Sequence, residues 1–247
     1  MGVDRRLELW HLVIKHAQGS PAAVDDVGAV TIEVAGVDAA AVSVTLATSP
    51  RETVYASDQV AADLEELTMT LGEGPGVDGM TGVPALAVDL SETASQARWP
   101  VFSPAAERLG VRAAFALPLQ VGGIRLGVMD LYRAQPGSLD QGQLTDALLL
   151  ADTACALLLD TATTPGDDRP PEQTSLQHPE VHQATGMVIA QLGVSAAIAL
   201  TRLRAYAYSH DRRLHDVAAS VVARRLRFER DTDAGPDPDE HVGRTGP

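Results

Sequence analysis

Apolar side chains recur three or four residues apart in four segments of the first 160 residues, a spacing that places them on one face of a helix. The predicted helices cover residues 3–17, 24–34, 60–71 and about 139–159. Gly19-Ser20-Pro21 ends the first helix and Gly36 ends the second. The fourth is so rich in Leu and Ala that we expect it to be buried against a sheet or a second subunit.

Alternating apolar and polar positions predict strands between these helices. Residues 113–121 and 124–132 alternate on either side of Gly122-Gly123, a two-residue turn that predicts a β-hairpin. Shorter strands are predicted at residues 42–46, 53–57 and 83–90. The segment Gly72–Gly79 is too rich in glycine to continue a helix, so we expect a loop there. This order of elements predicts an α+β domain over residues 1–160, with helices flanking an antiparallel sheet.

Three more amphipathic segments predict a small all-α domain over residues 178–230. The first helix begins at Pro179 and ends at Gly193, Ser195 caps the second, and the third begins near Leu214. The predicted core positions are Val181, Ala184, Val188, Leu192, Ala199, Leu200, Leu203, Ala207, Val217, Ala218, Val221 and Val222. Residues 161–177 have the composition of a linker, and the acidic tail 231–247 is predicted to be disordered.

Charge divides the chain along the same boundaries. The net charge is −14 overall, made up of −14 over residues 1–177, +4 over 178–230 and −4 over 231–247. Because electrostatic fields are screened beyond about 8–10 Å at cellular salt, a local positive segment is what attraction to phosphate requires. Arg224, Arg225, Arg227 and Arg230 equally suit the C-terminal end of a helix.

Other features of the composition indicate a cytoplasmic globular protein. There is no run of about 18 apolar residues and no leader pattern, so neither a membrane span nor a signal peptide is expected. The single cysteine, Cys155, lies among alanine and leucine and is expected to be a buried side chain without a disulfide partner.

Five short motifs in the first domain resemble those of GAF domains. They are G-E-G-P at Gly72 to Pro75, Asp89-Leu90, Arg98-Trp99-Pro100, Leu117-Pro118-Leu119, and Gly127 with Asp130-Leu131-Tyr132. The resemblance implies a sensor that responds to a small ligand, a redox change or a partner protein. Many GAF domains of this kind have Cys after G-E-G-P, where this chain has Gly76. Phe115 and Leu117 would line a ligand pocket but also suit an ordinary core, which we favour. The sequence identifies no cofactor.

The second domain resembles the ANTAR domain, an RNA-binding module of transcription antitermination regulators. Gln183-Ala184-Thr185-Gly186 corresponds to the family's Gln-Ala-Lys-Gly, with threonine in place of the lysine. Arg204 corresponds to an arginine of the second helix, and Asp211-Arg212-Arg213-Leu214 to an Asn-Arg-Lys/Arg-Leu turn. The resemblance implies binding to stem-loops of nascent transcripts, usually by dimers. The expected RNA-binding residues are His182, Gln183, Thr185, Arg204, Tyr208, Arg212 and Arg213.

Each of these assignments has a plainer alternative. Losing the lysine at Thr185 removes one phosphate contact unless His182 or Arg204 compensates. Arg204 and Tyr208 share a helix face and could meet an RNA loop together, or be a surface charge and a packing residue. Thr185 and Asp211, the departures from the family pattern, would also fit a degenerate domain that serves protein interaction. Three helices with Arg212 and Arg213 would equally fit a DNA-binding factor.

Catalytic and metal-binding patterns are weak. His178 and His182 are spaced i,i+4, but that pattern lacks its glutamate and third ligand, so no metal site is predicted. The loop Gly72–Gly79 lacks the lysine of a phosphate-binding loop. Asp89, Glu92 and Asp130 suit turns and strand ends better than acid-base catalysis, and we expect a non-enzyme.

Dimerisation is expected through the first domain. Pro165, Pro170, Pro171 and Pro179 interrupt the region where related proteins carry a coiled coil, so a coiled coil here is short or absent. The first and last amphipathic helices of the first domain are then the expected homodimer surface.

Overall fold

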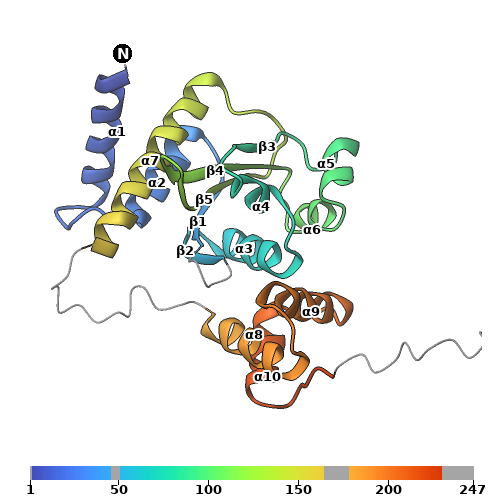
Figure 1. Ribbon diagram of the computed structural model, residues 1–247. Helices are drawn as coiled ribbons and strands as arrows, with labels where there is room; N and C mark the ends of the chain where they lie inside the picture. The colour runs from blue at the N-terminus through green and yellow to red at the C-terminus, as the bar shows by residue number, and fades with distance from the viewer. Residues whose placement is uncertain (1, 46–50, 164–177, 230–247) are drawn as a thin grey trace, which may run out of the picture.

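The computed structural model describes residues 2–45, 51–163 and 178–229. An α+β domain and a three-helix domain lie against each other, and helix α3 is the element of the first domain nearest to the second (Figure 1). The predicted α+β fold class, an antiparallel sheet flanked by helices and followed by a small all-α domain, is confirmed. The predicted linker and tail fall outside the described residues, except that the last helix of the first domain continues to Thr163.

The first domain is built on a five-stranded sheet whose neighbouring strands are all antiparallel. Its strands are β1 Ala39–Val44, β2 Glu52–Ala56, β3 Ala85–Ala87, β4 Ala113–Val121 and β5 Ile124–Arg133, in the order β2-β1-β5-β4-β3. The predicted hairpin is the pair β4 and β5, and Gly122 in its turn has a φ of 58°, which glycine adopts without steric cost. Alternation along β4 sends Phe115 to one face and Ala114 to the other.

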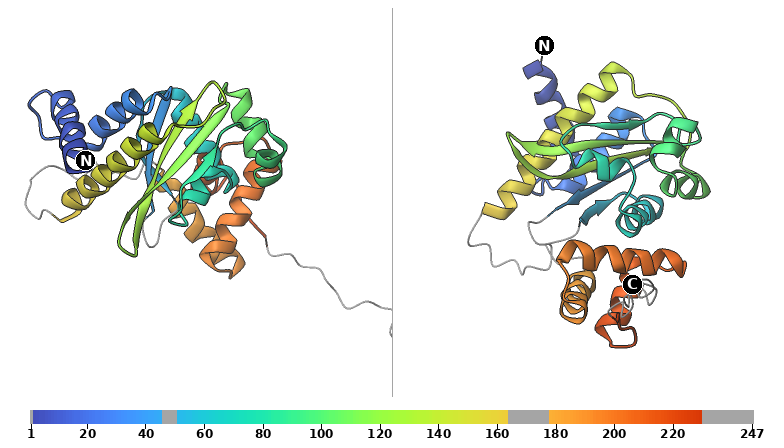
Figure 2. Two further views of the ribbon diagram at one scale, coloured as in Figure 1. Left: turned by 90° about the horizontal axis from the view of Figure 1, so that it is seen from above. Right: turned by 45° about the vertical axis from the view of Figure 1, so that its right-hand side comes forward.

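Helices cover both faces of this sheet (Figure 2). One face is packed by α1 Gly2–His16, α2 Val24–Ala35 and α7 Gln141–Thr163, and its core includes Phe115, Leu117 and Leu150. The other is packed by α3 Gln59–Leu71 and α6 Phe102–Arg108, around Leu64, Phe102 and Tyr132. Phe115 and Leu117 are therefore core residues, as favoured above.

Helix α7 is the one single helix in the described residues that is long and apolar enough to cross a membrane, judged by length and composition alone. The three-helix domain passes the same test only as a bent pair of its first two helices. In the fold, α7 packs against α2 and β4, and Leu150, Ala154 and Cys155 on it are fully buried. Its apolar character is thus used in the core of the first domain.

Two predictions for the first domain were wrong in detail. Residues Pro75–Gly79, expected as loop, form the short helix α4, because Pro75 suits the first helical position and the segment packs against β4. The predicted strand at 83–90 is reduced to three residues. Between β3 and β4 lie two short helices, α5 Thr93–Arg98 and α6.

The motif residues around α4 tie these short elements together. The Glu73 carboxylate accepts hydrogen bonds of 2.7 Å from the backbone N–H groups of Val101 and Phe102 at the start of α6. Asp78 accepts hydrogen bonds from Arg98 Nε at 2.8 Å and from Trp99 Nε1 at 3.1 Å. The G-E-G-P and Arg98-Trp99-Pro100 motifs therefore hold one corner of the domain in place.

The three-helix domain consists of α8 Pro179–Leu192, α9 Ala196–Ser209 and α10 Leu214–Val222. The predicted end of the first helix and cap of the second are confirmed: Gly193 follows α8 with a φ of 70°, and Ser195 Oγ accepts a hydrogen bond from the Ile198 N–H. The predicted core positions are buried except Leu192, Leu200 and Val222, which are partly buried at its edge.

Candidate nucleic-acid interface

One face of α3 carries the contact between the two domains. Asp63, Glu66 and Thr70 are spaced so that they lie on one side of the helix, and each contacts the three-helix domain. The hydroxyl of Thr70 accepts a hydrogen bond of 3.2 Å from the Leu214 N–H, which is the first backbone donor of α10. We call these three residues together with Met69 the docking face of α3.

Met69 is the apolar part of the docking face. Its side chain is 6 % exposed and belongs to the hydrophobic cluster formed by Val188, Leu203 and the other core residues of the three-helix domain. A methionine of the first domain therefore completes the core of the second. Burial of such a side chain contributes about 1.5–3 kcal/mol.

Arg204 on α9 lies against the end of α3. Its Nε donates a hydrogen bond of 2.8 Å to the backbone carbonyl of Met69, one of the last carbonyls of α3, which have no partner within the helix. Burial lowers the pKa of Arg204, because removal from water disfavours the charged guanidinium. In this arrangement Arg204 is half-buried between the domains.

The turn between α9 and α10 places its two arginines differently. Arg213 Nη2 forms an ion pair of 3.1 Å with Asp63 on the docking face. Arg212 Nη2 donates to the Asp216 carbonyl and to Ser220 Oγ, both at 3.0 Å, and so stays on its own domain. Asp211 has a φ of 50°, a left-handed conformation that Asn and Asp tolerate better than most residues. The replacement of the family's Asn by Asp211 therefore keeps the backbone of the turn.

The three predicted RNA-binding residues on α8 also have different surroundings. His182 Nε2 lies 3.7 Å from Glu52 Oε1 on β2, so this imidazole faces the first domain. Burial raises the pKa of Glu52, and His182 partly offsets that effect. Thr185 Oγ1 donates to the Val181 carbonyl on its own helix at 2.7 Å, whereas Gln183 is exposed.

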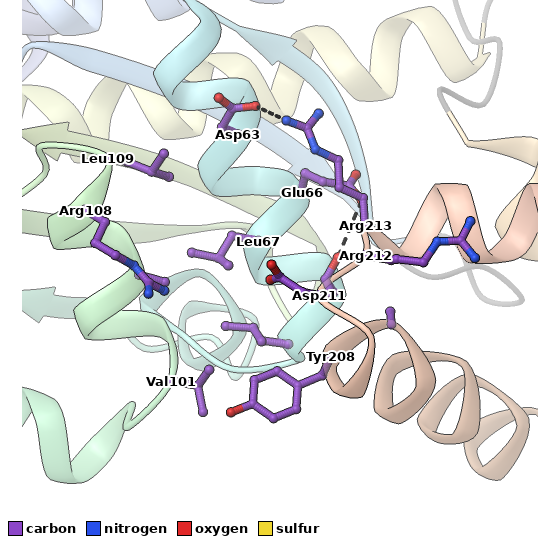
Figure 3. Close-up of a pocket in the computed structure, with 14 residues that line it drawn as sticks. Asp63, Glu66, Leu67, Val101, Arg108, Leu109, Tyr208, Asp211, Arg212 and Arg213 are labelled. Atoms are coloured by element: carbon purple, nitrogen blue, oxygen red, sulfur yellow. Dashed lines mark hydrogen bonds and ion pairs between the residues drawn. The ribbon is translucent and has the colours of Figure 1, made fainter.

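Tyr208 lies at the rim of a cavity of about 410 Å³ between the domains, and its ring remains 60 % exposed. Figure 3 shows this cavity, with Asp63 and Arg213 joined on one side, Val101 near Tyr208, and the guanidinium of Arg212 pointing away. The cavity is lined by α3, α6, the end of α9 and the turn that follows it.

Apart from Thr185, which bonds to its own helix, the predicted RNA-binding residues divide into two groups. His182, Arg204 and Arg213 contact the first domain, while Gln183, Tyr208 and Arg212 are exposed to solvent. The shared helix face expected for Arg204 and Tyr208 lies along the domain contact. Sequence reasoning missed the docking face itself, because Asp63, Glu66 and Met69 fit the pattern of an ordinary amphipathic helix.

Directly behind the docking face is a buried polar cluster in the first domain. The Glu65 carboxylate accepts hydrogen bonds from Tyr132 Oη at 2.8 Å and from Ser43 Oγ and Arg51 Nη2 at 2.5 Å. Arg51 also pairs with Asp130, and its Nε and Nη1 have no hydrogen-bond partner among the described residues.

The charges in this cluster do not balance, because one guanidinium faces two carboxylates. Burial raises the pKa of Asp130 to about 7; Arg51 opposes this shift and Glu65 adds to it. The attraction of Asp130 and Glu65 raises the pKa of Arg51 despite its burial. Gly76 lies beside Arg51 and Asp130, where an added Cβ would be 2.9 Å from an Asp130 carboxylate oxygen. The position of the family's cysteine is thus closely packed by charged groups.

The fold and the charged contact define a two-domain protein in which a small helical domain docks on an α+β domain through cationic side chains. Residues 173–222 match the sequence model of the ANTAR domain. The match takes in α8, α9 and α10 in full, so the three-helix domain is an ANTAR domain. No curated protein matches the chain.

Solved structures are similar to the first domain at low sequence identity. The GAF domain of an Acinetobacter phosphoenolpyruvate-protein phosphotransferase is 11 % identical, with 68 % of this chain and 98 % of that one covered and a TM-score of 0.46. A domain of a protein described as a two-component sensor histidine kinase from Sinorhizobium meliloti 1021 is 12 % identical, with coverages of 57 % and 90 % and a TM-score of 0.46. The GAF domain of the cyanobacteriochrome TePixJ is 15 % identical, with coverages of 57 % and 89 % and a TM-score of 0.44. Similarities at this level say nothing about a ligand or an activity. We refer to the first domain as the GAF-like domain and to the second as the ANTAR domain.

Proposed function

We propose that this chain is a cytoplasmic transcription antitermination regulator, without enzymatic activity, whose ANTAR domain binds stem-loops of nascent transcripts under the control of the GAF-like domain. One observation carries this proposal. Three of the side chains expected to bind RNA, His182, Arg204 and Arg213, lie against oxygen atoms of the GAF-like domain.

Those oxygen atoms resemble the groups that RNA would present. Asp63 and Glu52 are carboxylates, and the Met69 carbonyl carries the partial negative charge of a helix C-terminus. A phosphate oxygen would accept hydrogen bonds from the same donors. Docking on the GAF-like domain and binding of RNA therefore compete for one set of side chains, and the docked arrangement is the inactive one.

Helix α3 offers a route by which a signal would shift this competition. Glu65 on α3 is part of the buried cluster with Arg51 and Asp130, and the next residue, Glu66, is on the docking face. A ligand, redox change or partner protein that rearranges the cluster would move the docking face with it. Such coupling requires two arrangements of the domains with different RNA affinity, which docking and release supply.

The experiment is equilibrium binding of the full chain to structured RNAs and to duplex DNA at one salt concentration. Arg212→Ala tests an exposed ANTAR arginine, and Arg125→Ala, at an exposed arginine of the β4–β5 hairpin, is the matched control. Met69→Ala weakens docking without changing a cation. We expect binding to stem-loops, weakened several-fold or more by Arg212→Ala, strengthened by Met69→Ala and unchanged by Arg125→Ala.

The other readings correspond to distinct outcomes of this experiment. Tighter binding to duplex DNA than to stem-loops would identify a DNA-binding factor. If the folded chain and its Met69→Ala variant bind neither nucleic acid, the ANTAR domain serves protein interaction. Equal RNA affinity of the wild-type chain and the Met69→Ala variant would contradict control by docking.

We further propose that the chain is a homodimer through α1 and α7. Leu7, Trp10 and Ile14 on α1 are 53 %, 36 % and 47 % exposed. Leu7 and Trp10 line a shallow cavity together with Ala156 and Leu157 on α7. Helices α1 and α7 lie on the opposite side of the sheet from the ANTAR domain, so a dimer through them leaves the docking face accessible (Figure 1).

A further inference from the structure

Two histidines of the ANTAR domain converge on one carboxylate of the GAF-like domain. His178 Nε2 lies 3.5 Å from Glu66 Oε2, and His215 Nδ1 lies 3.0 Å from Glu66 Oε1. The two imidazole rings are stacked, with centroids 5.2 Å apart and an interplanar angle of 12°. Glu66 is buried in α3, while His178 precedes α8 and His215 is on the first turn of α10.

We propose that Glu66, His178 and His215 form a binding site for a divalent transition-metal ion, of which Zn²⁺ is the representative, and that the ion joins the two domains. Two imidazole nitrogens and one carboxylate oxygen are a ligand set that Zn²⁺ uses with a water or a further ligand in the fourth position. Hard cations such as Mg²⁺ prefer all-oxygen ligands and would be excluded.

The distances fit this assignment. A tetrahedral zinc ion with ligands at about 2.0–2.1 Å holds its ligand atoms about 3.3–3.4 Å apart. The two imidazole nitrogens each lie near that separation from one oxygen of the Glu66 carboxylate, His215 at 3.0 Å from Oε1 and His178 at 3.5 Å from Oε2. All three ligand atoms lie within 4.8 Å of one another, so no edge of the triangle has to shorten by more than about 1.5 Å.

Each histidine also has a second carboxylate next to the ring nitrogen that faces away from Glu66, as histidines that bind metals commonly do. His178 Nδ1 lies 3.2 Å from Glu180 Oε1, and His215 Nε2 lies 3.4 Å from Asp216 Oδ1. We call the ring nitrogen that faces Glu66 the inner nitrogen and the other one the outer nitrogen. A carboxylate next to the outer nitrogen holds the proton there, which leaves the inner nitrogen with a lone pair for the metal.

The inner nitrogen of His215 points to the same conclusion independently. Nδ1 of His215 is buried, and although it is close to Glu66 it makes no hydrogen bond of acceptable geometry within the described part of the chain. A buried nitrogen left without a partner costs free energy. A metal ion would supply the missing bond, and a cavity of about 460 Å³ lined by Glu66, His178 and His215 leaves room for a water at the open position.

The neighbouring cation does not exclude the site. Arg213 lines the same cavity, but its guanidinium is paired with Asp63. With Glu66, Glu180 and Asp216 around the two imidazoles, the surroundings are negative.

The consequence for regulation rests on the proposed function. An ion bound by ligands from both domains stabilises only the docked arrangement, so a free metal concentration 100 times its dissociation constant favours docking about 100-fold. The ion would then withhold Arg204 and Arg213 from RNA.

The test measures metal binding directly, by competition of the purified full chain with a chromogenic zinc chelator. We expect one Zn²⁺ per chain, no binding of Mg²⁺ at the same concentration, and at least tenfold weaker Zn²⁺ binding in His215→Ala and Glu66→Gln. His182→Ala distinguishes this site from the i,i+4 pair His178 and His182: because His182 faces Glu52 instead, its loss removes only one docking contact and should weaken zinc binding far less than His215→Ala. His16→Ala removes a histidine–aspartate pair of 2.9 Å elsewhere on the surface.

Two results would overturn the proposal. One is wild-type zinc affinity in His215→Ala and Glu66→Gln, both folded by circular dichroism. The other is loss of binding in His182→Ala alone, which would assign the metal to the i,i+4 pair His178 and His182. Amide hydrogen exchange of α3 and α10 with and without Zn²⁺ reports on the bridge, and protection is expected to increase. If zinc binds and bridges but RNA affinity does not change, the metal site stands and the proposed control of RNA binding fails.

Discussion

Substitution of Met69 by alanine separates the stability of the domain contact from the stability of either domain. The side chain belongs to α3 of the GAF-like domain but packs into the core of the ANTAR domain, and it is 6 % exposed. Removing it loses about 1.5–3 kcal/mol of apolar burial. The backbone carbonyl that accepts the hydrogen bond from Arg204 is retained.

This loss falls on the docking equilibrium. At about 1.4 kcal/mol for each factor of ten, it corresponds to a 10- to 150-fold shift towards the undocked arrangement. Amide hydrogen exchange followed by mass spectrometry is the assay, and faster exchange is expected in the last turn of α3 and in α9. Strands β4 and β5 should exchange as in the wild-type chain.

Met129→Ala is the matched control, because Met129 is fully buried in the sheet of the GAF-like domain and makes no part of the contact. It should accelerate exchange in the sheet. If Met69→Ala instead acts on the sheet as Met129→Ala does, or if it leaves α9 unchanged, the assignment of Met69 to docking is refuted.

Three other predictions concern the GAF-like domain. Burial raises the pKa of Asp130 to about 7 from an unfolded value near 4, so between these pH values the folded chain holds a proton that the unfolded chain releases. The free energy of unfolding should therefore fall by up to about 4 kcal/mol as pH rises from about 4 to 7. Urea titrations should show a flatter dependence of this free energy on pH for Asp130→Asn. Gly76→Ala should destabilise by about 1–3 kcal/mol, since its Cβ meets Arg51 and Asp130; an unchanged melting temperature relative to Gly123→Ala, in open space, would contradict this. Replacing Leu7 and Ile14 together by glutamate should give monomers by light scattering, and a persisting dimer would exclude α1 as the interface.

The parts of the fold that follow from the sequence are those whose causes are local. The hairpin is specified by alternation and by Gly122-Gly123, and α8 by Pro179 and Gly193, all within a few residues of the structure they determine. Helix α4 is different, because glycine is a poor helix former and the segment is held in place by packing on β4. No local pattern indicates that support.

The candidate site could be predicted only in part for the same reason. The match to the family motif identifies Arg204, but the carbonyl that it binds is 135 residues away in the sequence. Likewise, the sequence pairs His178 with His182 by their i,i+4 spacing, whereas the structure brings His178 to Glu66 and His215. Periodicity marks the face of a helix, but it does not say which element covers that face.

The docking of the ANTAR domain on α3 joins two parts of one chain, and this gives the contact the character of an internal competitor. The docking equilibrium is the ratio of docked to undocked forms of a single chain. Dilution therefore does not shift it, whereas dilution dissociates a dimer or an RNA complex. An RNA that binds only the open arrangement has its affinity weakened by the fraction of chains that are open. Under the proposed function, the concentration of free transcript that half-saturates the protein is therefore set by contacts such as those of Met69, Asp63 and Glu66, and not by the protein concentration.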